Sequence, residues 1–244
     1  MANSCALVWL RRDLRCDDHA ALYHALRRFE RVYCAFVFDT DILDALPRKQ
    51  DRRVEFIHAS VLQLHGALQA LSAGAGVPGG GLIVRHGSAA QCIVQLARSL
   101  GVQEVLTNRD YEPEAIARDQ RVAQDLSGLG IAFSDYKDQV LLDRDEVLTQ
   151  LKPYPVALYA RHLAPIPVEE RLPALEQLGF ERTNLQALPM PAGMDGAQQL
   201  LQDFLPRMHA YQEARDFPGR KGVSYLSVHL RFGTVFIRAL AGLA

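Results

Sequence analysis

Charged side chains follow directly after the first apolar run of the chain. Residues Ala6–Leu10 are all apolar, and the sequence then continues with Arg11, Arg12, Asp13 and Arg15. A continuous apolar run of this length is typical of a strand that is buried on both faces of a sheet. Guanidinium and carboxylate groups are costly to bury without partners. They therefore predict either ion pairs or a polar binding site at the carboxyl end of this strand.

A second polar cluster follows a later apolar run, where residues 108–112 read NRDYE. If the two strands are neighbours, Asp110 and Glu112 face the arginines of the first cluster across one crevice. Planar donors on one wall and carboxylates on the other suit a flat heterocycle with polar edges. The alternative is that these charges pair with one another and only hold the strand ends together.

The third stretch that could do chemistry lies at residues 211–233 (YQEARDFPGRKGVSYLSVHLRFG). Its central part reads as a loop that leads into a helix, with Ser224 and Ser227 as available caps. Free backbone N–H groups and hydroxyl groups at a helix start suit a phosphate, and the preceding Arg220 and Lys221 add positive charge. The alternative is an ordinary capped helix start without a ligand.

Strand-like and helix-like segments alternate through the first 136 residues. Apolar runs predict five strands, at Ala6–Leu10, Arg31–Phe38, Leu82–Arg85, Glu104–Thr107 and Ala132–Tyr136. Amphipathic patterns predict helices between them, at Asp18–Phe29, Arg52–Leu71, Ala89–Leu100 and Pro113–Leu129. This alternation predicts an α/β fold with a doubly wound, five-stranded parallel sheet of the Rossmann-like type. In the strand order 3-2-1-4-5 the first and fourth strands are adjacent, which brings the first two polar clusters together.

The pattern changes after residue 136. Residues 137–196 contain Pro- and Gly-rich stretches without a clear period, and they predict a connection between two domains. Helical patterns return at 197–214 and again at 226–244, where they break near Gly233. We therefore expect an α/β domain at 1–136, a linker at 137–196 and the truncated start of a helical domain at 197–244.

Composition and motifs narrow the classes of function. The formal net charge is −1, so bulk charge predicts no attraction to nucleic acid, although residues 206–244 are locally basic. None of the four cysteines forms a C-x-x-C pair, which favours reduced thiols over disulfides or a zinc site. A G-x-G-x-x-G match at 74–79 lies between a predicted helix and a predicted strand, the reverse of a dinucleotide site. The sequence contains no Walker A loop and no G-x-S-x-G elbow.

Together, the three polar stretches resemble the DNA photolyase/cryptochrome family. LVWLRRDLRCDDHAAL resembles the family's opening strand and turn, VLTNRDYEPEAIARDQRV its fourth strand and following helix, and YQEARDFPGRKGVSYLSVHLRFG its flavin-binding loop. The resemblance implies an α/β domain that carries an antenna pigment in some members, and an all-helical domain that holds FAD. It also implies that photoexcited reduced FAD donates an electron to a pyrimidine dimer in DNA. Because that chemistry belongs to the cofactor, we expect no catalytic side chain and no metal.

The resemblance also implies roles for individual residues. FAD contacts are expected from Tyr211, Val223, Ser224, Tyr225, Leu226 and Ser227. Val223 replaces the threonine usual at its position, which removes one hydroxyl group. Arg215 matches a position that contacts DNA in photolyases. Arg11, Asp110 and Glu112 match positions that hold a deazaflavin antenna, whereas Ala115 replaces the binding glutamate of the folate-type pattern.

The resemblance implies the N-terminal portion of a light-dependent DNA repair lyase that splits cyclobutane pyrimidine dimers. Two alternatives stay open, a cryptochrome photoreceptor and a non-catalytic pigment- or nucleotide-binding module. The family's flavin-ring and lesion pockets lie further along the chain, so residues 1–244 alone are expected to be inactive and to bind FAD weakly. We further expect a monomer with damaged DNA as its partner. Neither a signal-peptide pattern nor a bilayer-spanning apolar run is found, which predicts a cytoplasmic protein with no membrane contact.

Overall fold

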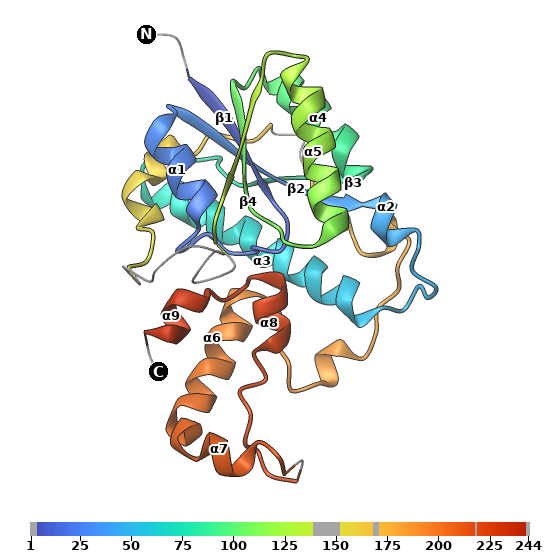
Figure 1. The fold of residues 1–244 in the computed structure, drawn as a ribbon, viewed down its shortest axis with the longest axis vertical. Coiled ribbons are helices and arrows are strands. Elements are labelled where there is room, and N and C mark those ends of the chain that lie inside the picture. Colours follow the sequence, from blue (N-terminus) through green and yellow to red (C-terminus); the bar gives the residue numbers. More distant parts are fainter. Residues whose placement is uncertain (1–3, 139–151, 168–170, 218, 243–244) are drawn as a thin grey trace.

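The computed structural model describes residues 4–138, 152–167, 171–217 and 219–242. At its centre is a five-stranded parallel sheet in the order β3-β2-β1-β4-β5 (Figure 1). The strands are β1 Cys5–Leu10, β2 Arg31–Asp39, β3 Leu82–Gly87, β4 Glu104–Asn108 and β5 Ala132–Tyr136. Strand β1 lies in the middle and is buried along its whole length. The predicted doubly wound sheet and its strand order are therefore confirmed.

Helices cover both faces of this sheet. The long ones are α1 Ala20–Arg28, α3 Arg52–Gly74, α4 Ala89–Leu100 and α5 Pro113–Ser127. Side chains alternate along a strand, so Ala6, Val8 and Leu10 pack with α1 and α3 on one face. Leu7 and Trp9 pack with α4 and α5 on the other face. The apolar run of β1 thus serves two cores at once, which explains why it lacks alternating polar residues.

Local capping sets the helix ends. Helix α1 begins at Ala20, two residues later than predicted, because His19 occupies its N-cap. Gly101 ends α4 with a φ of 63° in the left-handed region. Pro113 occupies the first turn of α5, as predicted. The short helix α2, Thr40–Leu43, was not predicted, since four residues are too few to show a period.

The described part of the predicted linker packs against the α/β unit. It forms three 3₁₀ helices, η1 Val156–His162, η2 Glu176–Leu178 and η3 Leu185–Ala187. Leu163 forms a parallel bridge with Val32, and the N–H group of Ala164 donates to the Val32 carbonyl at 2.8 Å. Leu178 and Phe180 join the core on the α1/α3 face. Prolines remove the helical period from this segment, but several of its apolar side chains, among them Leu178 and Phe180, are still buried.

The C-terminal part is helical and projects from one end of the α/β unit (Figure 1). It contains α6 Gly193–Phe204, η4 Leu205–Ala210, α7 Tyr211–Ala214, α8 Ser227–Phe232 and α9 Ile237–Ala241. The helix predicted at 197–214 is interrupted by η4, because Pro206 has no N–H group to donate. The predicted break at Gly233 is confirmed, with a φ of 62°.

The described residues contain no disulfide bond, no bilayer-spanning helix and no cluster of potential metal ligands. All four cysteines are free, and burial raises the pKa of Cys16 to about 11. Among the described residues no helix combines the length and hydropathy needed to cross a bilayer. Nor do these residues gather three potential metal ligands in one place.

Candidate functional site

A cavity of about 260 Å³ lies at the carboxyl ends of β1 and β2. Its apolar walls include Trp9, Phe36, Phe38, Ile42, Leu43 and Ile57. Its charged walls include Arg11, Arg12, Asp110 and Arg118. The volume is close to that of the smaller ligand pockets in proteins, roughly 300 Å³. Apolar walls with a few convergent charges suit a flat ring that has polar edges.

Arg12 joins the two polar clusters that the sequence predicted to meet. Its guanidinium group lies 2.5 Å from Glu112 and 3.7 Å from Asp110. Glu112 also lies 2.6 Å from Arg231 on α8. The hydrogen bond from Arg12, assisted by Arg231, lowers the pKa of Glu112 to about 2. Asp110 lines the cavity and Glu112 does not, so one carboxylate faces a ligand space while the other holds two arginines together.

Arg11 pairs with a residue that the sequence analysis missed. It lies 2.5 Å from Asp119 on α5 and also donates to the carbonyl oxygen of Asn108. Arg118 shares Asp119 at 3.2 Å. The guanidinium carbons of Arg11 and Arg118 lie 4.8 and 4.9 Å from the ring centroid of Trp9. Burial, and then the nearby Arg11, lower the pKa of Arg118. Two arginines thus fix the indole as one wall of the cavity.

A buried charge cluster ties α9 to the loop after β1. Arg238 lies 2.9 Å from Asp18 and 2.9 Å from Asp138, and Arg15 also pairs with Asp138. All four side chains are buried. Burial alone would raise the pKa of Asp138, but Arg15 and the other neighbouring cations lower it to about 2. This cluster holds the arginine-bearing loop and the C-terminal helices in one arrangement.

The predicted flavin-binding residues lie around α7 and the loop that leads to α8. Tyr211 is exposed at the start of α7, with its ring 6.0 Å from that of Phe204. A Cβ atom added to Gly222 would lie 2.6 Å from the Cβ of Ala214, so the loop passes directly against the end of α7. Arg215, the predicted DNA contact, is exposed beside this loop and lies 3.7 Å from the carboxylate of its neighbour Asp216.

The loop itself has an unusual backbone. The carbonyl of Val223 accepts a hydrogen bond from Arg207 at 3.1 Å, and the Ser224 hydroxyl accepts one from the N–H group of Leu226 at 3.3 Å. Tyr225 has a φ of 59°, and Leu226 is buried. Ser227 begins α8, which has no hydrogen bond from a capping side chain. The predicted serine cap of α8 is therefore wrong: Ser224 shapes the loop, Ser227 lies inside the helix, and the helix start has no capping side chain.

Comparisons with known proteins agree with this geometry. The family model described as DNA photolyase matches residues 6–165. A deoxyribodipyrimidine photo-lyase of Synechococcus sp. (strain ATCC 27144 / PCC 6301 / SAUG 1402/1) is 32% identical over 95% of this chain and 52% of its own length. An uncharacterized 31.6 kDa protein of Synechococcus sp. (strain PCC 6716) is also 32% identical, over 98% of this chain and 89% of its own length.

Solved structures show the same fold. A class III photolyase from Agrobacterium tumefaciens matches with a TM-score of 0.80 and 22% identity, over 100% of this chain and 53% of its own. A cryptochrome from Synechocystis sp. PCC6803 matches with a TM-score of 0.81 and 22% identity, over 99% and 56%. The chain thus spans about half the length of the photolyases and cryptochromes it matches. The match over residues 6–165 shows that this chain belongs to the DNA photolyase family.

Proposed function

We propose that this chain forms the antenna-binding part of a deoxyribodipyrimidine photo-lyase, and that its C-terminal helices begin the FAD-binding region. The cavity at the carboxyl ends of β1 and β2 carries this proposal, because its lining suits a tricyclic pigment. A Sulfolobus tokodaii photolyase with the same fold, at a TM-score of 0.72, holds two FAD molecules that imply a novel light-harvesting cofactor. Relatives named deoxyribodipyrimidine photo-lyase, at 29–32% identity, support dimer repair as the activity of the whole protein.

A deazaflavin fits the chemistry of the cavity. Its flat rings would pack between Trp9 and the aliphatic side chains that α2 and α3 contribute. Its pyrimidinedione edge carries both N–H and C=O groups. Asp110 can accept from that N–H, while Arg11 and Arg12 can donate to the carbonyl oxygens. We assign Glu112 a positioning role, since it holds Arg12 and Arg231 from outside the cavity.

The loop before α8 is the proposed phosphate site for FAD. Helix α8 begins without a side-chain cap, so the N–H groups of its first turn are available to an anion. Ser224 and Ser227 add hydroxyl groups, and Tyr211 begins α7, the preceding helix in the chain. Reduced FAD, when bound and excited by light, supplies the electron that splits the dimer. Arg215, exposed on the same part of the molecule, would contact the phosphate backbone of damaged DNA.

Pigment binding is tested by equilibrium dialysis of the purified chain. We expect one equivalent of 8-hydroxy-5-deazariboflavin to bind, and methenyltetrahydrofolate to bind more weakly. Repair is tested on FAD-loaded protein from the native host, illuminated with an oligonucleotide that contains a thymine dimer. Light absorption without dimer splitting would favour a cryptochrome. Absence of pigment binding would contradict the proposal for the cavity.

A second candidate is a pigment-binding module that works without repair chemistry. The two candidates differ in the native protein: a repair enzyme binds both pigment and FAD, whereas the module binds pigment alone. Absorption spectra of the purified native protein separate them.

A further inference from the structure

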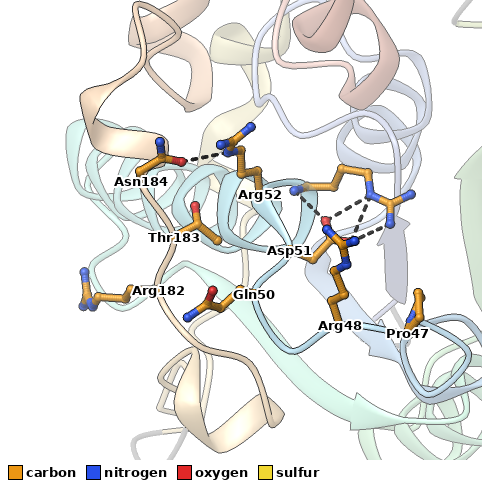
Figure 2. A pocket seen from close by; sticks show the side chains of 9 residues that line it. Pro47, Arg48, Gln50, Asp51, Arg52, Arg182, Thr183 and Asn184 are labelled. Atoms are coloured by element: carbon orange, nitrogen blue, oxygen red, sulfur yellow. Dashed lines mark hydrogen bonds and ion pairs between the residues drawn. The ribbon is translucent and has the colours of Figure 1, made fainter.

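An open cleft of about 900 Å³ lies between the segment before η3 and the start of α3 with the residues just before it. It shares one lining residue, Arg53, with the cavity at the carboxyl ends of β1 and β2. Figure 2 shows its side chains, which come from two segments more than a hundred positions apart in the chain. Four of the lining residues are arginines: Arg48, Arg52, Arg53 and Arg182. Asp51 is the one carboxylate among its lining residues. This surface is therefore strongly basic in a chain of formal net charge −1.

Specific hydrogen bonds hold the two sides of this cleft together. The buried carboxylate of Glu55 accepts from the backbone N–H group of Thr183 at 2.7 Å and from its hydroxyl group at 2.5 Å. Arg52 donates from Nε to the side chain of Asn184 at 2.8 Å (Figure 2). A backbone bond of 2.9 Å joins Glu181 to Lys49. These hydrogen bonds fix the two segments relative to each other, so the positions of the cleft arginines are defined by the fold.

The carboxylates in the cleft and at its rim already interact with neighbouring side chains. Asp51 caps α3 and pairs with Arg53 at 2.5 Å, which lowers the pKa of Asp51. At the rim, Glu181 accepts from Gln50 at 3.0 Å, and Glu176 lies 3.7 Å from the exposed Arg182. Among the described residues Arg48 forms no ion pair or hydrogen bond with another side chain. Several guanidinium nitrogens therefore stay available to a ligand.

We propose that this cleft binds a phosphate-rich anion, one with at least two adjacent phosphoryl groups. A planar guanidinium group can donate two parallel hydrogen bonds to the oxygens of one phosphate. Several guanidinium groups close together therefore favour a multivalent anion. The lining contains no aromatic ring, so it would recognise the phosphates and not a base or a pigment. The polyphosphate chain of a nucleotide and the backbone of a nucleic acid both carry this chemistry. The inference is independent of the antenna function proposed above.

Isothermal titration calorimetry of the full chain tests this inference. The probes are tripolyphosphate, ATP and an undamaged oligothymidylate, with citrate as an anion that lacks phosphorus. The variant Arg48→Ala/Arg182→Ala removes two cleft arginines that do not border the antenna cavity. The matched control is Arg98→Ala/Arg121→Ala, which removes the same charge from exposed positions outside the cleft.

We expect at least one phosphate probe to bind the parent chain, and to bind the cleft variant about tenfold more weakly because two charge-assisted contacts are lost. The control variant should retain the parent affinity. Binding of tripolyphosphate and ATP indicates a nucleotide-type ligand, and binding of oligothymidylate alone indicates a nucleic acid backbone. The inference is overturned if no phosphate probe binds, if citrate binds equally well, or if both variants weaken binding equally.

Discussion

Arg238 donates from Nε to both carboxylate oxygens of Asp18, at 3.1 and 2.9 Å, although 220 positions separate the two residues in the chain. Asp18 is fully buried in the loop after β1 and has a φ of 44°, which non-glycine residues rarely adopt. The same loop carries Arg11 and Arg12 into the cavity at the carboxyl ends of β1 and β2. A residue near the end of the chain therefore helps to set the geometry of the site at its beginning.

Replacing Arg238 with methionine should destabilise the fold strongly. The change leaves the buried Asp18 without its cation and removes one of the two cations beside Asp138. Removing one partner of a buried ion pair costs about 3–5 kcal/mol, because the remaining charge stays out of water. Urea unfolding followed by circular dichroism measures this loss. The exposed Arg121→Ala change should stay within about 0.5 kcal/mol of the parent, and equal effects of the two variants would show that the cluster contributes little.

Gly233→Ala should be more damaging than Gly101→Ala, although both glycines end helices with nearly the same φ, 62° and 63°. A Cβ atom at Gly101 meets nothing within 4 Å, so its change carries only the conformational penalty of about 1–2 kcal/mol. A Cβ atom at Gly233 would lie 2.2 Å from the carbonyl oxygen of Arg12. We expect an additional loss of about 1–3 kcal/mol there, measured by the same unfolding experiment. Equal losses would contradict the close packing of α8 on this loop.

His229 should make stability depend on pH. Its side chain is fully buried beside Phe56, with ring centroids 5.2 Å apart, and burial lowers its pKa from 6.5 to about 4. The unfolded chain therefore takes up a proton in a range where the folded chain does not. The free energy of unfolding should fall as the pH drops from about 6.5 to 4, by up to about 3 kcal/mol.

The substitution His229→Phe isolates this effect, because phenylalanine fills a similar space and does not titrate. Unfolding measured across the pH range should then show a flatter profile between pH 6.5 and 4. The exposed His209→Phe change serves as the control and should leave the profile as it is in the parent. A profile that His229→Phe does not flatten would assign the pH dependence to other groups.

Asp110 and Glu112 should differ in their effect on pigment binding. Asp110 lines the cavity, so Asp110→Ala should weaken deazaflavin binding about tenfold by removing a charged acceptor. Glu112 lies outside the lining, so Glu112→Ala should act less strongly, through the loss of its contacts to Arg12 and Arg231. Fluorescence titration of the bound pigment measures both. Unchanged affinity in Asp110→Ala would mean that this carboxylate only holds the strand ends together.

The central sheet was predictable because burial leaves a local signal. Strands β1, β2 and β3 contain short apolar runs, and the covering helices have apolar stripes, so Leu7 and the helices around it could be placed from the sequence. The strand order then predicted that Arg12 and Asp110 would meet, as they do at 3.7 Å. Proximity at a sheet edge follows from topology once the strands are known.

Ion pairs between residues that are far apart in the chain leave no such signal in the sequence. Asp119 lies in the middle of α5, and nothing in the surrounding sequence shows that it faces Arg11. The contact of Arg238 with Asp18 joins a helix near the chain end to a strained loop, and ion pairs of this kind have no periodicity. The arginine-lined cleft was missed for the same reason, since Arg48 and Arg182 meet only after the predicted linker packs on the α/β unit.

Trp9 offers the most direct test of the pigment cavity. It is the only tryptophan of the chain, and it forms one wall of the cavity between Arg11 and Arg118. Its indole N–H group gives a single resonance in a ¹H–¹⁵N correlation spectrum. On titration with 8-hydroxy-5-deazariboflavin, we predict that ring currents of the bound pigment shift this resonance until one equivalent is reached. A pigment that binds while the Trp9 resonance stays in place would contradict the assignment of this cavity as the antenna site.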